Sequence, residues 1–380
     1  MILFFLVTAF VLIIYVVLLI YYRNGWNQLS DFQPATINPG PATYLTVIIP
    51  ARNEALHLPA LLDSIDRQTY SKKNFEVLLI DDHSTDDTAA IASAYSFVTC
   101  LSLKDFVGDA GINSYKKKAI EIGIQNSRGK LIITTDADCM VPEKWLETIA
   151  AFYEEKKPAF IVMPVSVNCS ARPIEIFQAL DFMSLQGITA AAVHKKAHSM
   201  CNGANLAYSR NAFEAVAGFK GIDAIASGDD MLLLHKIALQ YPNDIHYLRS
   251  KNVIVQTAAV NTIKDFLNQR IRWASKAGKY DDKTIFLVLL IVYLLNVLLL
   301  ILPLVSMAGG CWRVAGYSLV LIAFKTIAEL IFLYPVAKFF GKQQLLWTFP
   351  LAQPFHIVYT VIAGWLGQFG SYQWKERKVK

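Results

Sequence analysis

A long apolar run at the start of the chain constrains the fold more than any other feature. Residues 2–22 have a single polar interruption, Thr8, and about 20 apolar residues form a helix long enough to cross a bilayer. A secretory signal peptide begins with a basic segment, whereas no Lys or Arg precedes Arg23 here. The run therefore predicts an uncleaved membrane anchor. The positive-inside rule places the residues from 23 onward in the cytoplasm.

Three further apolar segments lie near the other end of the chain, at residues 284–307, 314–336 and 345–369. The first two are joined by a short loop and predict a helical hairpin, after which Lys338 and Lys342 fall on the cytoplasmic side. A fourth complete span would place the basic tail outside, against the same rule. Pro350 and Pro354 interrupt this last segment, so we expect it to be partly re-entrant or interfacial.

One of these segments contains two opposite charges. Lys325 and Glu329 are four residues apart, a spacing that places both on one helix face. Each charge alone would be costly at the bilayer centre. We therefore expect a neutralising pair, and a role on a substrate path is the alternative.

The composition agrees with a membrane protein that also carries a globular domain. Hydrophobic residues make up 54% of the chain, charged residues 17%, and the mean hydropathy is +0.36, which excludes disordered, collagen-like and disulfide-scaffold chains. Five cysteines without CxxC spacing predict reduced thiols in the cytosol. The net charge of +6 fits phosphate ligands or an anionic membrane, and it does not decide between them. We expect no binding to nucleic acid, because the globular region has no basic helix or aromatic platform.

The region after residue 44 alternates short β-branched runs with helical stretches. The expected strands are residues 46–49, 75–80, 98–103, 131–135 and 159–165, and the expected helices are residues 54–68, 86–95, 116–127 and 142–155. This order predicts an α/β domain with a mostly parallel sheet and helices on both faces. Such sheets bind ligands at the carboxyl ends of their strands.

Polar clusters follow three of the expected strands. They are residues 50–54 (PARNE), 81–87 (DDHSTDD) and 135–138 (TDAD). In an extended segment Asp136 and Asp138 would point the same way, and two such carboxylates can share Mg²⁺ or Mn²⁺ with phosphate oxygens. For Asp86 and Asp87 the alternative is simple capping of the next helix.

Four later segments carry further signals. Residues 202–207 (NGANLA) are small enough for close backbone approach, residues 227–231 (SGDDM) open a helix, and residues 262–265 resemble a capping box. The helix after this box places Gln269, Arg272 and Trp273 on one face, which is suited to holding a diphosphate; an interfacial helix is the alternative. Residues 173–187 predict a helix on the membrane surface beside the acceptor entrance, with core packing as the alternative.

Taken together, these strings closely resemble the family 2 glycosyltransferases, a large inverting family with the GT-A fold. The resemblance covers roughly residues 44 to 276 and includes VIIPARNE, DDHSTDDT, KKKAI, TTDADC, NGANLAYSR, SGDD and QRIRW in the family's order. It implies that Asp81 and Asp82 bind the nucleoside and that Lys116 meets the diphosphate. Asp136 and Asp138 would hold ribose and metal, and Asp230 would be the catalytic base.

The remaining site residues follow from the same resemblance. Pro50, Arg52, Glu54 and Ala137 are expected to bind the nucleotide sugar, while Asn205, Asp229, Gln269, Arg272 and Trp273 close over donor and acceptor. Two positions depart from the family pattern: His83 stands where a glycine is usual, and Tyr115 precedes Lys116 where the family often has glycine.

The sequence therefore predicts an inverting, metal-dependent membrane glycosyltransferase. We expect a UDP-linked donor, a lipid or glycan acceptor and Mg²⁺ or Mn²⁺. The alternatives are a processive polysaccharide synthase of the cellulose, chitin or hyaluronan type, and a transporter or structural membrane protein with a non-catalytic fold of this kind. The expected parts are an anchor (1–23), a linker (24–43), the catalytic domain (44–261), the QxxRW and interfacial region (262–283), membrane helices (284–370) and a basic tail (371–380).

Overall fold

The computed structural model describes residues 1–34, 42–107, 112–197, 200–225, 228–275, 283–369, 372–374 and 377–379. The chain divides into two compact units. The sheet unit consists of Leu29–Asn168 and Ala192–Ala258, and the helical unit of Met1–Gln28, Cys169–Ala191 and Ala259–Lys380.

A seven-stranded sheet forms the centre of the sheet unit, with the strand order β3-β2-β1-β4-β8-β6-β9. The strands are β1 (Leu45–Ala51), β2 (Phe75–Asp81), β3 (Val98–Ser102), β4 (Leu131–Thr134), β6 (Phe160–Val162), β8 (Leu206–Ser209) and β9 (Ile245–Tyr247). Strands β3, β2, β1 and β4 are parallel to one another, and β8 is antiparallel to both of its neighbours. The predicted mostly parallel sheet is thus confirmed.

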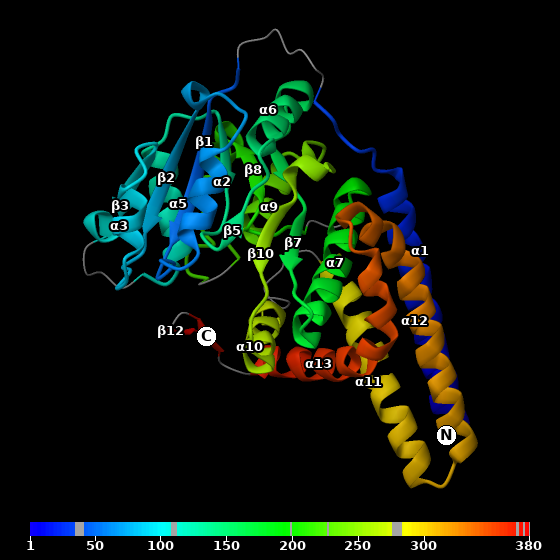
Figure 1. Ribbon diagram of the computed structural model, residues 1–380. Helices are drawn as coiled ribbons and strands as arrows, with labels where there is room; N and C mark the ends of the chain where they lie inside the picture. The colour runs from blue at the N-terminus through cyan, green and yellow to red at the C-terminus, as the bar shows by residue number, and fades with distance from the viewer. Residues whose placement is uncertain are drawn as a thin grey trace. The chain divides into compact units, whose positions relative to one another are not determined.

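Smaller elements complete the sheet unit (Figure 1). The helices are α2 (Leu58–Asp66), η1 (Lys72–Asn74), α3 (Thr88–Ser93), α4 (Lys104–Val107), α5 (Tyr115–Gln125), α6 (Trp145–Lys156), α8 (Arg210–Ala215), α9 (Met231–Gln240) and η2 (Lys251–Val253). A second sheet joins β5 (Cys139–Met140), β10 (Val255–Ala258) and β7 (Val165–Asn168). Each of the four helices predicted from periodicity is present, although shorter than expected.

The core of the sheet unit forms where α5 packs on β1 and β2. Val47, Ile48 and Ile49 are fully buried, as expected for a strand covered on both faces. The helix approaches closely because residue 123 is glycine: a Cβ there would lie 2.8 Å from Ile48 Cγ2. This packing fixes the start of α5 beside the ends of the strands.

The helical unit contains the predicted membrane segments. Its helices are α1 (Ile2–Gln28), α7 (Pro173–His194, shared with the sheet unit), α10 (Ile263–Ala274), α11 (Lys283–Ala308), α12 (Trp312–Phe340), η4 (Gln343–Thr348) and α13 (Phe349–Phe369), followed by β11 (Tyr372–Trp374) and β12 (Arg377–Val379). Among the described residues, five helical segments are long and apolar enough to cross a membrane, beginning at residues 2, 173, 283, 312 and 343.

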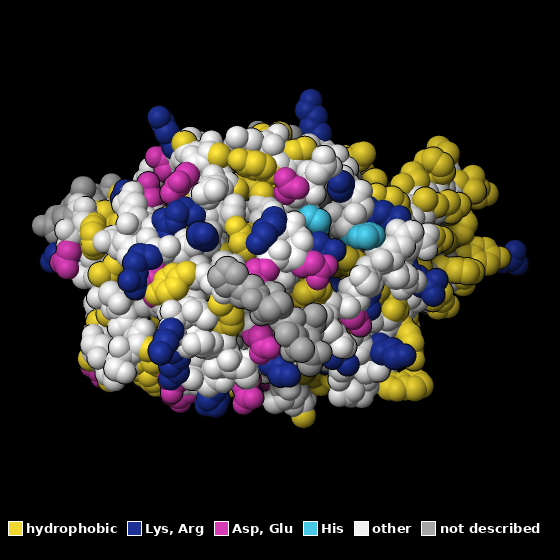
Figure 2. All heavy atoms as spheres, turned by 90° about the horizontal axis from the view of Figure 1, so that it is seen from above, with side chains coloured by type: hydrophobic (Ala, Val, Ile, Leu, Met, Phe, Trp, Pro, Cys, Tyr) yellow, Lys and Arg dark blue, Asp and Glu magenta, His cyan; other side chains and the backbone are white. Residues whose placement is uncertain are grey.

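Helices α1, α11 and α12 pack side by side (Figure 1). At one end the Phe5 and Tyr317 rings lie 6.1 Å apart, and at the other end the Trp26 and Phe339 rings lie 5.5 Å apart. Arg23 and Lys338 therefore belong to the same end of this bundle. Hydrophobic side chains gather over these helices in Figure 2, as expected for a surface that faces lipid.

Two predictions about the helical unit need correction. Pro354 lies inside α13 and does not interrupt it, and the change from 3-10 to α-helix falls earlier, at Phe349. The polar stripe of α7, part of the pattern that predicted a helix at the membrane interface, is buried, including Gln178 and Asp181. Phe177 joins an aromatic cluster with Phe266 and Tyr359. The alternative of core packing is therefore the correct one for α7.

Candidate functional site

The candidate site lies at the carboxyl ends of β2, β1 and β4, which are neighbours in the sheet. Asp81 ends β2, and Asp82 follows it with its backbone N–H donated to Ala51 O at the end of β1 (2.8 Å). Asp136 comes two residues after the end of β4. The polar clusters predicted from the sequence are therefore brought to one edge of the sheet.

Lys116 links this edge to a distant part of the chain. Its Nζ lies 2.6 Å from Asp136 Oδ1 and 3.2 Å from Asp229 Oδ2. Burial lowers the pKa of Lys116, but the charges of Asp136 and Asp229 raise it more, and the resulting pKa is well above the ordinary range. The side chains of Lys116 and Asp136 remain 21% and 36% exposed. The lysine is therefore charged, and its side chain is partly open to solvent.

Gly203 allows the acidic segment to come this close. A Cβ at residue 203 would lie 3.1 Å from Lys116 Nζ and 3.2 Å from Asp229 Oδ2. The sequence predicted close backbone approach in residues 202–207 but did not place Gly203 in the site. The available signal was the glycine in the string NGAN, together with the acid pair Asp229 and Asp230 later in the sequence.

The two acids before α9 have different contacts. Asp230 is the N-cap of α9: its Oδ1 accepts the Met231 N–H (2.7 Å), and its Oδ2 accepts the Gly203 N–H (3.1 Å). Asp229 instead faces Lys116. The cap of α9 is therefore Asp230 and the partner of Lys116 is Asp229. Ser227 of the same motif lies outside the described residues.

The segment that carries Asp136 and Asp138 is a turn, because the Cys139 N–H donates to Asp136 O (3.2 Å). Strand alternation therefore does not apply to these two carboxylates, which corrects the geometric premise of the predicted metal site. Among the described residues, no group of three His, Cys, Asp or Glu side chains could hold a metal ion. Two carboxylates nevertheless fit Mg²⁺, which commonly takes one or two from the protein and completes its shell with phosphate and water.

The loops after β1 and β2 are tied to each other. Arg52 Nη1 donates to Asp82 O (2.9 Å) and to His83 O (3.2 Å). Asn53 Oδ1 accepts the Thr85 N–H (2.8 Å), and both Asn53 and His83 have positive φ, at 51° and 56°. These contacts hold the two loops in one arrangement at the strand ends.

Three other residues that were predicted to bind the nucleotide sugar lie in the same region. Pro50 is part of β1, opposite Ile80 of β2. The Glu54 N–H donates to Thr88 Oγ1 (2.8 Å), and Ala137 is buried in the turn after β4. At the start of α3 the Asp86 Oδ1 accepts the Thr88 N–H (3.1 Å), whereas Asp87, the N-cap, makes no side-chain capping bond.

Asn205 does not fit its predicted role of closing over substrates. The residue is fully buried, and its Nδ2 donates to Pro164 O (2.8 Å) and Val253 O (2.7 Å). Its Oδ1 accepts the Trp145 indole N–H (3.0 Å). Because its amide is fully engaged in the core, Asn205 has a structural role.

The QxxRW residues Gln269, Arg272 and Trp273 belong to α10 in the helical unit. The sequence analysis missed their neighbour Arg270, which is buried. Its Nη2 lies 2.8 Å from Asp181 Oδ2 of α7, and its Cζ lies 4.2 Å from the centre of the Trp273 ring. Tyr359 also donates to Asp181 (2.5 Å). The available signal was a carboxylate at residue 181 on the polar stripe of α7.

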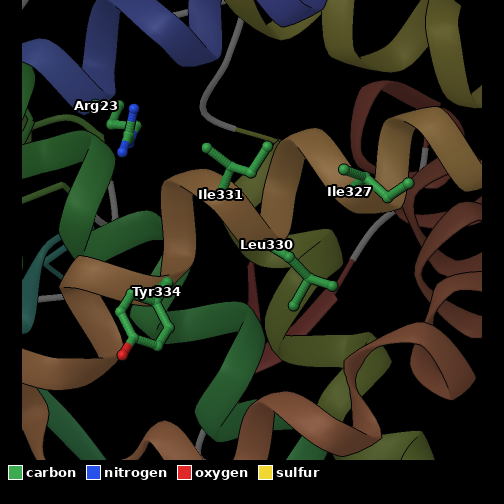
Figure 3. A pocket seen from close by; sticks show the side chains of 5 residues that line it. All are labelled: Arg23, Ile327, Leu330, Ile331 and Tyr334. Carbon is green, nitrogen blue, oxygen red and sulfur yellow. The ribbon is translucent and has the colours of Figure 1, made fainter.

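The helical unit also contains an apolar groove of about 360 Å³ (Figure 3). Ile327, Leu330, Ile331 and Tyr334 line it from α12, and Arg23 contributes from α1. Arg23 is exposed. A mostly apolar wall beside one cation is suited to contact with an anionic lipid.

Comparison with known proteins identifies the class of the sheet unit. Residues 46–217 match the family model described as Glycosyl transferase family 2. The chain thus carries a family 2 glycosyltransferase domain, and its fold is that of the GT-A enzymes.

Individual relatives match over shorter stretches. Glycosyltransferase AglE of Haloferax volcanii is 35% identical over 104 residues, which is 27% of this chain and 33% of that protein. A dolichyl-phosphate beta-glucosyltransferase of Dictyostelium discoideum is 37% identical over 113 residues, which is 27% of this chain and 32% of that protein. The chain thus spans about a third of the length of these curated relatives.

One solved structure matches nearly the whole chain. It is the mannosyltransferase PcManGT from Pyrobaculum calidifontis in complex with GDP-Man and Mn²⁺. The TM-score is 0.56 at 20% identity, and the match covers 93% of this chain and 98% of that one. At this identity the likeness supports the fold.

Proposed function

We propose that this protein is a membrane-bound, inverting glycosyltransferase that moves a sugar from a nucleotide sugar to a lipid-linked or membrane-embedded acceptor. Its reaction would belong to the synthesis of a cell-envelope glycan or glycolipid. The observation that carries the proposal is Lys116, a charged lysine with a partly exposed side chain, held between Asp136 and Asp229 at the carboxyl ends of parallel strands. Such an edge is where open α/β sheets bind ligands.

The proposed chemistry is a single in-line displacement at the anomeric carbon. Asp230 accepts the proton of the acceptor hydroxyl while the new glycosidic bond forms, and the nucleoside diphosphate leaves from the opposite face. Lys116 exchanges part of its pairing with Asp136 and Asp229 for the diphosphate oxygens. A divalent ion held by Asp136 and Asp138 would neutralise charge on the leaving group.

We further propose that the acceptor is a lipid phosphate or a related membrane lipid. The relative from Dictyostelium is named for a dolichyl-phosphate acceptor, and the groove beside Arg23 suits an apolar chain with an anionic head. The sheet unit would face the cytoplasm, since Arg23 and Lys338 belong to one end of the helix bundle.

The test is transfer by the purified full-length protein in bilayers. A panel of radiolabelled nucleotide sugars is supplied with Mg²⁺ or Mn²⁺, and lipid-soluble products are separated from polymer. We expect one labelled lipid product that is lost in excess EDTA. No transfer from any donor would contradict the proposal, and full activity in EDTA would remove the metal from it.

The second candidate is a processive polysaccharide synthase, which the QxxRW string Gln269, Arg272 and Trp273 on α10 also fits. The same assay separates the two functions. A long polymer that remains bound to the membrane would identify the synthase, whereas a product carrying one added sugar would identify the lipid transferase.

A further inference from the structure

The two positions that depart from the family pattern contact each other. The rings of His83 and Tyr115 lie 5.9 Å apart at an interplanar angle of 88°, an edge-to-face geometry that aromatic rings favour. His83 follows β2 directly after Asp81 and Asp82, and Tyr115 is the first residue of α5, directly before Lys116. The ring pair thus connects the segment expected to bind the nucleoside with the segment expected to bind the diphosphate.

The His83 side chain is fixed at this place. Its φ of 56° is in the left-handed region that glycine tolerates best. Its Nδ1 lies 2.9 Å from Asp82 Oδ1, and its carbonyl accepts Arg52 Nη1 at 3.2 Å. Because the ring is held by Asp82 on one side and Tyr115 on the other, it cannot turn aside for a larger ligand without losing these contacts.

A second observation at the same strand end points to a ligand. Asp81 is 8% exposed, and its Oδ1 is buried without a hydrogen-bond partner among the described residues. A buried carboxylate oxygen without a donor is costly, so such an atom calls for a bound N–H or O–H. The imide N–H of uracil is a donor of this kind, whereas cytosine presents a lone pair at the same ring position.

We propose that His83 and Tyr115 wall the base pocket beside Asp81 and restrict the donor to a uridine diphosphate sugar. A purine is a pyrimidine fused to a five-membered ring, and an imidazole in place of glycine fills a volume of that size. The inference rests on the proposed function and deepens it, because it names the nucleotide that the site selects.

Nucleotide binding to the full-length protein in detergent tests this directly. Affinities for UDP, CDP and GDP are measured by calorimetry with Mn²⁺, without any acceptor. In the wild type we expect UDP to bind at least about tenfold more tightly than either of the others, which is the scale of discrimination by pocket shape. In His83→Gly we expect GDP to gain about tenfold relative to UDP, while CDP remains excluded by Asp81.

Matched variants separate selectivity from stability. His83→Gly removes a side chain from a residue with positive φ, so this variant is expected to fold. Lys157→Gly, at the end of α6, also replaces a residue with positive φ (48°) and is the control. Lys157→Gly should leave all three affinities unchanged. Tyr115→Phe should preserve the selectivity because the ring remains, and Tyr115→Ala should relax it.

The outcomes distinguish this inference from the proposed function. If the wild type binds none of the three diphosphates, the proposed function fails. If the wild type binds one or more of them but does not prefer UDP, or if His83→Gly leaves the GDP to UDP ratio as in the wild type, the base-pocket inference is wrong and the transferase proposal stands.

Discussion

Lys116 and Lys325 are both lysines held by acids, and their surroundings differ sharply. Lys325 is fully buried in α12, with its Nζ 2.7 Å from Glu329 Oε1 and 2.8 Å from Gln353 Oε1. Tyr15 of α1 donates to the same Glu329 oxygen at 2.7 Å. Lys116 has two acidic partners, Asp136 and Asp229, but its side chain is 21% exposed and that of Asp136 is 36% exposed.

The difference shows how exposure separates a structural ion pair from a binding site. Around Lys325 every charge has a protein partner on α1, α12 or α13, so the cluster joins three helices where an unpaired charge would be costly. Around Lys116 the partners can be exchanged for a ligand, because solvent already reaches them. We therefore expect changes at the Lys116 site to affect chemistry and binding, and changes at Lys325 to affect folding.

The largest effect is expected at the proposed base. Asp230→Asn keeps an oxygen that can cap α9, since Asn and Asp are equally good caps, but it removes the proton acceptor. Transfer should fall about 10²-fold or more while UDP affinity stays near the wild-type value. Initial rates and calorimetry on the same preparation measure both quantities.

Asp229→Asn is the comparison for this variant. It weakens the contact with Lys116 and should therefore lower donor affinity more than turnover. If Asp230→Asn retains more than about a tenth of wild-type turnover, Asp230 is not the base and Asp229 becomes the candidate.

The buried cluster should respond in stability. Glu329→Gln leaves the Lys325 ammonium without its counter-charge and should cost about 3–5 kcal/mol. The double variant Lys325→Met, Glu329→Leu should recover most of this loss. Thermal unfolding in detergent measures both, with Phe324→Leu at an exposed position of α12 as the control. If the double variant is as unstable as Glu329→Gln, the pair Lys325 and Glu329 has a role beyond neutralising each other's charge.

Features set by local sequence could be predicted for this chain. Strands β1, β2 and β4 follow from runs of Ile, Val and Leu, and the long helices α1, α11 and α12 follow from the length of their apolar runs. The Lys325 to Glu329 pair follows from helical spacing.

Features that depend on distant contacts could not be predicted. Asn205 appeared to be a site residue, but Trp145 and two backbone carbonyls occupy its amide. The pair of Arg270 with Asp181 depends on the packing of α7 against α10, which no local pattern reveals. The turn at Asp136 was missed because alternation was extended beyond the end of β4, where a backbone hydrogen bond bends the chain.

A moderate effect is expected at Lys116. Lys116→Met removes a charged hydrogen-bond donor from the diphosphate, and UDP affinity should fall about 10-fold to 100-fold. The control is Lys118→Met, on the same helix and paired with Glu121, which should bind UDP as tightly as the wild type.

Because nearby acids hold the pKa of Lys116 above its ordinary range, this lysine stays protonated at every pH below that range. It should therefore add no pH dependence to binding between about pH 6 and pH 9.

The smallest effect is expected at the start of α10, where a polar contact is exposed and local. Thr262 Oγ1 accepts the Asp265 N–H (3.1 Å) and donates to Asp265 Oδ2 (2.7 Å). Thr262 is thus the N-cap of α10, and the Asp265 carboxylate accepts its hydroxyl instead of the backbone N–H that a capping box would use. Thr262→Ala should cost about 1 kcal/mol, well below the loss from Glu329→Gln, and Thr262→Ser should retain most of the stability. Hydrogen exchange of the first turn of α10 measures the difference. If Thr262→Ala and Thr262→Ser showed equal protection from hydrogen exchange, the packing of Phe266 alone would fix the start of this helix. The comparison between buried and exposed polar contacts would then rest on Lys325 alone.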